Sequence, residues 1–142
     1  MLPESHNHSL FFSDNRSIIA LEQKRKSYIG INSNKKKFFC YIPDKMYSNK
    51  EEACDYLLLN QNDKLAYFIE LKGSDVLKAV DQISNSLDLY FKHINGFEIN
   101  ARIVSRSNVT DLKYSKFTEL NERIKKLGGT LKKQNNKLEE NI

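Results

Sequence analysis

Residues 67–83 read YFIELKGSDVLKAVDQI, a stretch that predicts a buried strand followed by a helix. The strand begins with the apolar run Tyr67-Phe68-Ile69, and Glu70 and Lys72 interrupt it before Gly73 ends it. Charged side chains are costly to bury unless a partner compensates them. This stretch therefore indicates a compensated group of charges at the end of a core strand.

A second carboxylate is expected beside Glu70. Side chains alternate along a strand, so Glu70 and Lys72 share the face of Phe68. The preceding apolar segment, ACDYLLL, carries Asp55 at its front. A hairpin turning within residues 60–63 pairs residue 55 with residue 69 or 70. Two carboxylates and an ammonium group are thus predicted to meet at one end of a sheet.

The remaining pattern predicts an α/β protein. Strands are expected over residues 37–42, 53–59, 64–72 and 97–104, and helices over residues 75–91 and from about residue 110 to 127. Residues 14–29 favour a helix, although they also read well as strands. The first three strands form an antiparallel meander, and a helical crossover brings the fourth strand in parallel. The expected fold is a small mixed β-sheet with αβββαβ core order, flanked by helices, plus a C-terminal helix.

Length and composition favour one soluble domain. The chain has 142 residues, which suits a single domain over residues 1–128, with residues 1–12 as a polar arm and 129–142 as a basic, flexible tail. No apolar run is long enough to span a bilayer, and the N-terminal residues do not resemble a signal peptide. Cys40 and Cys54 are expected as reduced, partly buried side chains, which suits a cytoplasmic protein.

The basic residues are clustered. The net charge is +5, and an excess of positive charge favours polyanionic partners. The clusters are Lys24-Arg25-Lys26, Lys35-Lys36-Lys37 and the segment from Lys125 onward. Each cluster alone is more often a solvated surface than a binding site, so only their joint presence points to phosphate contacts.

Asp55 and Glu70 suggest a site for a hard cation. Two adjacent carboxylates repel each other and raise each other's pKa unless a cation lies between them. Mg²⁺ prefers oxygen ligands of this kind and often binds substrate phosphates as well. The alternative is a plain ion network in which Lys72 neutralises the two acids.

The segments CDYLLL and ELK, followed by a helix that carries Gln82, resemble the PD-(D/E)xK phosphodiesterase superfamily and its restriction-endonuclease-like fold. In size and layout the chain is similar to small Holliday junction resolvases. The resemblance implies a metal-dependent nuclease, most simply a DNA endonuclease in defence, repair or recombination. It also leaves a non-catalytic nucleic-acid-binding or accessory subunit with the same fold as an alternative.

The resemblance assigns roles to individual positions. It implies that Asp55 and Glu70 bind Mg²⁺ or Mn²⁺, that the Leu71 carbonyl joins them, and that Lys72 activates the attacking water. Gln82 supports the site, and Glu22 is the candidate for a further acidic ligand on the first helix. A homodimer or a larger complex would suit cleavage of both strands of a duplex. The expected phosphate-binding residues are Lys24, Arg25, Lys26, Lys35, Lys36, Lys37 and Arg106.

Overall fold

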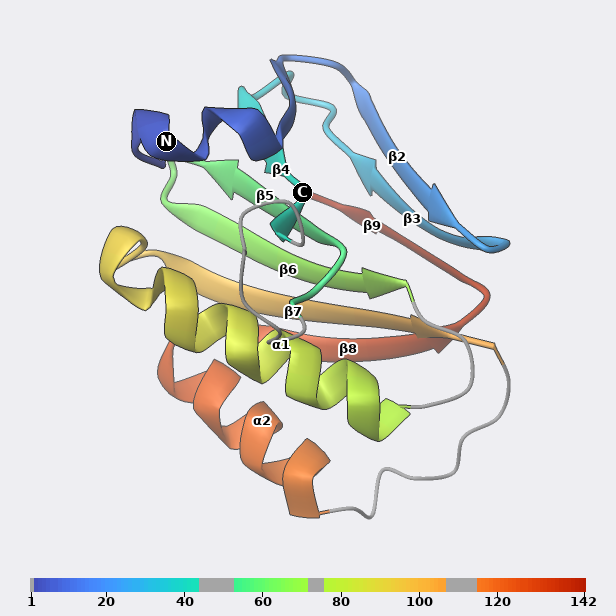
Figure 1. Ribbon diagram of the computed structural model, residues 1–142. Helices are drawn as coiled ribbons and strands as arrows, with labels where there is room; N and C mark the ends of the chain where they lie inside the picture. Colours follow the sequence, from blue (N-terminus) through green and yellow to red (C-terminus); the bar gives the residue numbers. More distant parts are fainter. Residues whose placement is uncertain (1, 44–52, 72–75, 107–114) are drawn as a thin grey trace.

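A six-stranded mixed sheet forms the centre of the protein, as seen in a computed structural model that describes residues 2–43, 53–71, 76–106 and 115–142 (Figure 1). Its strand order is β1-β4-β5-β6-β7-β8, and a second sheet has the order β2-β3-β9. The strands of the large sheet are β1 (Leu10–Asp14), β4 (Phe38–Tyr41), β5 (Tyr56–Asn60), β6 (Leu65–Leu71), β7 (Glu98–Ser105) and β8 (Gly128–Asn135). Those of the small sheet are β2 (Ile18–Gln23), β3 (Lys26–Ile31) and β9 (Lys137–Asn141).

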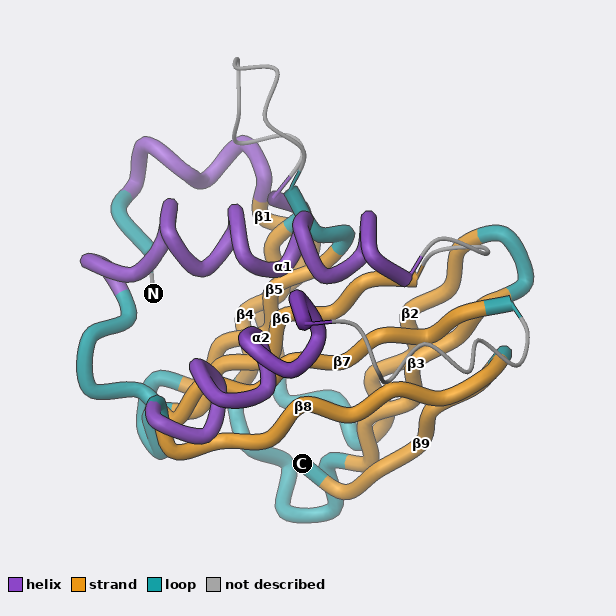
Figure 2. Tube along the Cα trace, turned by 90° about the horizontal axis from the view of Figure 1, so that it is seen from below, coloured by secondary structure: helices purple, strands orange, loops and turns teal. Residues whose placement is uncertain are grey.

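The helices cover one face of the large sheet. α1 (Val76–Tyr90) and α2 (Ser115–Lys126) contact each other and pack on β6, β7 and β8. Figure 2 shows the large sheet between these helices and the strands of the small sheet. α1 and α2 lie within the ranges 75–91 and about 110–127 that were predicted to be helical, and no described helix is long and apolar enough to cross a membrane.

The central βββαβ segment has the predicted connections. β4, β5 and β6 form an antiparallel meander, and β7 returns parallel to β6 after α1. The αβββαβ order as a whole is not confirmed, because the described residues before β4 contain three strands and a 3₁₀ helix, η1 (Glu4–Ser9), in place of an α-helix. The protein is thus α/β with two sheets.

Both faces of the large sheet are buried along its inner strands β5 and β6. Along β6, Phe68 packs toward α1, whereas Tyr67, Ile69 and Leu71 pack toward the small sheet. This burial on both faces explains why the sequences of β5 and of residues 65–69 in β6 are continuous apolar runs and do not alternate between apolar and polar residues. It also means that the charged side chains of these strands lie inside the protein.

The expected helix over residues 14–29 is wrong. β2 and β3 form an antiparallel hairpin there, and Lys24 and Arg25 occupy its turn with positive φ angles of 46° and 67°. Such angles in both turn residues match the right-handed twist of the flanking strands. Along β2, Ile19 and Leu21 are buried and their neighbours are exposed, which is the two-residue period of a strand.

The basic tail is also not flexible. Residues 128–135 form β8 and residues 137–141 form β9, which pairs in parallel with β3. Leu131 packs against the helical core and Leu138 is buried between the sheets, so a few apolar residues anchor both strands. The sequence of this segment is polar because most of its side chains point to solvent.

The N-terminal arm is packed rather than loose. Leu2 is buried in the helical core and its amide donates a hydrogen bond to the Tyr41 hydroxyl at 3.2 Å. β1 then forms an edge of the large sheet by pairing with β4. Residues 10–12, expected at the end of a polar arm, therefore lie in the sheet.

Candidate active site

The two predicted carboxylates do meet. Tyr56 pairs with Ile69 in the β5–β6 hairpin, which places Asp55 opposite Glu70 at the end of both strands. Asp55 is 4% exposed and Glu70 is fully buried. The prediction that residue 55 lies beside residue 69 or 70 is confirmed.

Reciprocal hydrogen bonds hold these two carboxylates. The Asp55 amide donates to Glu70 Oε1 at 3.0 Å, and the Leu71 amide donates to Asp55 Oδ2 at 2.8 Å. Each side chain therefore bonds to the backbone of the other strand. Because each carboxylate is bonded to the backbone of the opposite strand, these bonds fix the orientation of both groups.

Gln82 joins the pair from α1. With its amide nitrogen turned toward Glu70, Gln82 donates to Glu70 Oε2 at 2.9 Å and to the Lys78 carbonyl at 3.3 Å. This orientation satisfies the hydrogen-bond network better than the reverse one, in which the nitrogen lies 3.5 Å from the Ala53 carbonyl. α1 thus presents Gln82 to the face of the sheet on which Glu70 lies.

Sequence reasoning assigned no role to Ser86 in this site. Its hydroxyl accepts a hydrogen bond from the Cys54 amide at 2.9 Å and donates to the Gln82 carbonyl at 2.9 Å. Ser86 therefore ties the residue before Asp55 to the turn of α1 that carries Gln82. Ser86 follows Gln82 by four residues, and residues at this spacing share one helix face, so the sequence did contain a signal that Ser86 lies near the site.

Glu22 does not belong to this group. It lies on β2 with its side chain exposed, whereas Ile19 and Leu21 on the same strand point into the core between the sheets. Glu70 lies on the opposite, helical face of the large sheet. The expected role required Glu22 to lie on a helix. Because this segment forms the β2–β3 hairpin, Glu22 does not reach the acid pair.

The basic residues divide between the two ends of the large sheet. Lys36 forms an ion pair with Asp63 in the β5–β6 turn at 3.1 Å, so the cluster Lys35-Lys36-Lys37 lies at the end away from Asp55. Lys24 and Arg25, in the β2–β3 turn, and Arg106 are exposed at the same end as Leu71. Lys26 is only 7% exposed and donates to the Lys24 carbonyl, so it is not a surface cation.

Backbone hydrogen bonds bring Lys24, Arg25 and Arg106 near one another. The Ser27 amide donates to the Asn136 carbonyl at 3.0 Å, and the Asn136 amide donates to the Ser105 carbonyl at 2.8 Å. The start of β3 and the end of β7 therefore lie on either side of the β8–β9 turn. Lys72 lies outside the described residues, so its position relative to Glu70 stays a prediction.

A buried ion pair on the other face of the sheet was not predicted. Arg102 of β7 contacts Glu140 of β9 at 2.7 Å, with side chains 4% and 10% exposed. The Tyr28 hydroxyl donates to the same Glu140 oxygen at 2.8 Å. Burial alone would raise the pKa of Glu140, but the hydrogen bonds from Arg102 and Tyr28 and the charge of Arg102 lower it below its ordinary value. This network joins the two sheets.

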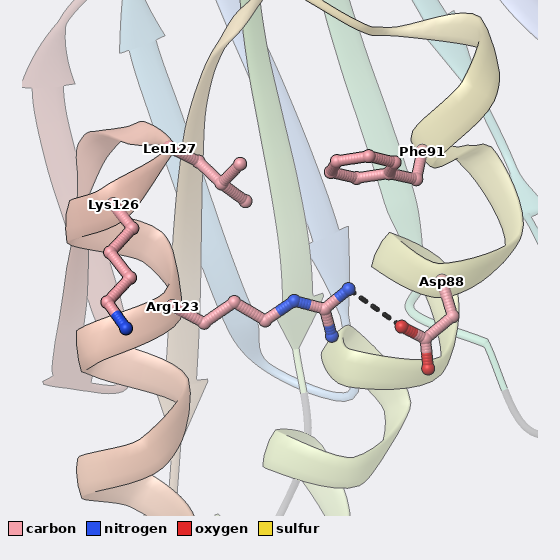
Figure 3. A pocket seen from close by; sticks show the side chains of 5 residues that line it. All are labelled: Asp88, Phe91, Arg123, Lys126 and Leu127. Carbon is pink, nitrogen blue, oxygen red and sulfur yellow. Dashed lines mark hydrogen bonds and ion pairs between the residues drawn. The ribbon is translucent and has the colours of Figure 1, made fainter.

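A surface pocket of about 430 Å³ lies between the C-terminal ends of α1 and α2. Phe91 and Leu127 form its apolar walls, and Arg123 donates to Asp88 across it at 2.7 Å (Figure 3). A smaller pocket of about 240 Å³ lies farther along the same helix pair. Neither pocket is lined by Asp55 or Glu70, so the acid pair does not lie in either of them.

Asp55 and Glu70 form a pair of carboxylates. Among the described residues no larger group, of three or more His, Cys, Asp or Glu side chains, is arranged to hold a metal ion. A hard cation there would take further oxygen ligands from backbone carbonyls and water. Comparisons with known proteins add no assignment, because no family model, no curated protein and no solved structure matches this chain.

Proposed function

We propose that this protein is a metal-dependent phosphodiesterase that cleaves nucleic acid, most simply a DNA endonuclease. The observation that carries the proposal is the Asp55–Glu70 pair, two buried carboxylates held at the ends of adjacent strands by reciprocal backbone hydrogen bonds. Such a fixed pair of oxygen ligands suits Mg²⁺ or Mn²⁺, either of which lowers the pKa of a bound water and clamps phosphate oxygens.

Four residues share three roles in this proposal. Asp55 and Glu70 bind the ion, and Gln82 orients Glu70 through the hydrogen bond to Oε2. Lys72, two residues after Glu70 in the sequence, supplies the positive charge near the attacking water. The exposed cations at this end of the sheet, Lys24, Arg25 and Arg106, would contact backbone phosphates.

The burial of Glu70 supports a second candidate function. Both of its oxygens accept hydrogen bonds inside the protein, as a purely structural carboxylate would. In that case the chain would be a non-catalytic nucleic-acid-binding or accessory subunit. The two candidates differ in whether the acid pair binds a divalent ion and supports cleavage.

A cleavage assay on matched variants tests the proposal. Linear, supercoiled and branched DNA and structured RNA are incubated with the protein and Mn²⁺, with a chelator as the blank. Glu70→Gln should abolish single-turnover cleavage, and Lys72→Ala should slow it by at least ~10²-fold. The control Glu122→Gln, at an exposed position of α2, should cleave at the wild-type rate.

Two results would reject catalysis. The first is cleavage that persists unchanged in both Glu70→Gln and Lys72→Ala, which would identify a contaminating nuclease or another site. The second is the absence of metal-dependent cleavage on every substrate despite salt-sensitive DNA binding, which would favour the non-catalytic function.

A further inference from the structure

Histidines from distant parts of the sequence meet at the far end of α1. His6 lies in η1, and His93 ends the short 3₁₀ helix η3 (Phe91–His93) that follows α1. Their ring centroids are 5.6 Å apart and the ring planes are inclined at 69°. Two of the three histidines in the sequence thus share one contact, although the chain between them forms most of the sheet.

His6 carries a polar atom without a partner. Its Nδ1 atom is shielded from solvent and has no hydrogen-bond partner among the residues that the structure describes. A buried polar atom without a partner is uncommon in folded proteins and calls for an explanation. A metal ion is one partner that an imidazole nitrogen commonly takes.

We propose that His6 and His93 form a two-imidazole binding site for a transition-metal ion such as Zn²⁺. Zinc–nitrogen bonds are about 2.0–2.1 Å long, which places two rings on one ion at centroid separations of roughly 5–6 Å. The observed 5.6 Å separation falls in this range. No third His, Cys, Asp or Glu side chain among the described residues completes the set, so water fills the other coordination positions.

Lys92, which directly precedes His93 in η3, is exposed and places a positive charge beside the two rings. The ammonium group of Lys92 opposes a nearby cation, so binding should tighten when Lys92 is replaced by Gln.

The metal would connect the N-terminal segment to the helical layer. η1 precedes β1 at one edge of the large sheet, whereas η3 follows directly from α1. The pair lies beyond the C-terminal end of α1, whereas the acid pair contacts that helix at Gln82 and has oxygen ligands that suit harder ions. Binding of Zn²⁺ here is therefore independent of the proposed phosphodiesterase activity.

A titration of the full-length chain with Zn²⁺, followed through the imidazole NMR signals, tests this proposal. The signals of His6 and His93 should change together and saturate at the same Zn²⁺ concentration. His6→Gln or His93→Gln should weaken binding by at least ~10-fold, since each removes a ligand. His8→Gln and Asp55→Asn should leave the affinity unchanged, and amide spectra of all four variants establish that they fold.

Three results would overturn the two-imidazole site. These are an unchanged affinity in His93→Gln, signals of His6 and His93 that follow different curves, and an equal loss of affinity in His8→Gln. The first two would leave the rings as an ordinary edge-to-face packing pair. Loss of Mn²⁺-dependent cleavage in Asp55→Asn with Zn²⁺ binding intact would separate this inference from the proposed function.

Discussion

Asp55 and Glu70 illustrate how two buried carboxylates are accommodated at single-residue scale. Each accepts a hydrogen bond from the backbone of the opposite strand, and Gln82 can donate a further one to Glu70. These bonds replace water that burial removes, which is the condition under which charged groups are tolerated in a core. The same bonds keep both groups in fixed positions, as a metal site requires.

Arg102 and Glu140 form the other buried charged pair, and Glu140→Gln tests its contribution. The variant leaves the Arg102 guanidinium buried without its counter-charge, so we expect a loss of about 3–5 kcal/mol in the free energy of unfolding. The control Glu139→Gln removes an ion pair to Lys137 whose side chains are both more than half exposed, and should change stability by less than ~0.5 kcal/mol. Urea denaturation at neutral pH measures both.

The pH dependence of the same variant has a definite sign. The pKa of Glu140 is lower in the folded protein than its ordinary value of 4.5. Its stabilising effect is therefore complete above pH 4.5 and is lost as the pH falls through the lower folded value. The difference in stability between wild type and Glu140→Gln should shrink on acidification, and a difference that stays constant would contradict this account.

At the residue scale, the sequence predicted contacts between residues that are close in the chain and missed a contact between distant ones. Asp55 and Glu70 are fifteen residues apart on either side of one hairpin, so strand alternation and turn position were enough to place Asp55 beside Glu70. Arg102, in contrast, pairs with Glu140, which lies on a strand that the sequence did not reveal. A pairing between distant segments has no local signature.

At the scale of elements, the β7–β8 pairing depends on a close backbone approach. A Cβ atom at Gly129 would collide with the Ile99 carbonyl oxygen, where the register of the two strands shifts. Gly129→Ala should therefore cost about 1–3 kcal/mol through forced backbone movement. Gly96→Ala is the comparison, because a Cβ there meets nothing within 4 Å and only its φ of +86° is unfavourable. A smaller loss in Gly129→Ala than in Gly96→Ala would contradict this reading.

β9 contributes to stability through one anchoring side chain. Leu138 is 1% exposed between the two sheets, so Leu138→Ala should lower the free energy of unfolding by about 2–5 kcal/mol. The control Ile18→Ala removes an apolar side chain that is 57% exposed on β2 and should have a far smaller effect. Equal effects in thermal or urea denaturation would mean that β9 does not dock as described.

The sequence predicted some elements and missed others for one physical reason. The strands and helices from residue 38 to 105 have enough apolar residues to show their period. β8 and β9 contain two leucines, Leu131 and Leu138, among mostly polar residues, so their composition resembles that of a disordered tail. Their strand geometry depends on backbone pairing with β7 and β3, which is tertiary information.

At the scale of the whole molecule, α1 and α2 cover one face of the large sheet and the small sheet covers the other, so the candidate functional residues lie at the ends of its strands. The ends of β5 and β6 hold the acid pair, and exposed cations lie at the same end on the neighbouring β2–β3 turn and beyond β7. The acid pair and these exposed cations therefore share one end of the large sheet. The opposite end carries Lys35–Lys37, and the far end of α1 carries the His6–His93 contact.

The central claim is that Asp55 and Glu70 bind a hard divalent ion. Electron paramagnetic resonance measures it directly, because the signal of free Mn²⁺ falls as the ion binds to protein. We expect saturable binding in wild type, none in Glu70→Gln, and wild-type affinity in Glu122→Gln, whose carboxylate is exposed on α2. Mn²⁺ binding of equal affinity in wild type and Glu70→Gln, or no binding in wild type, would contradict the assignment of this site.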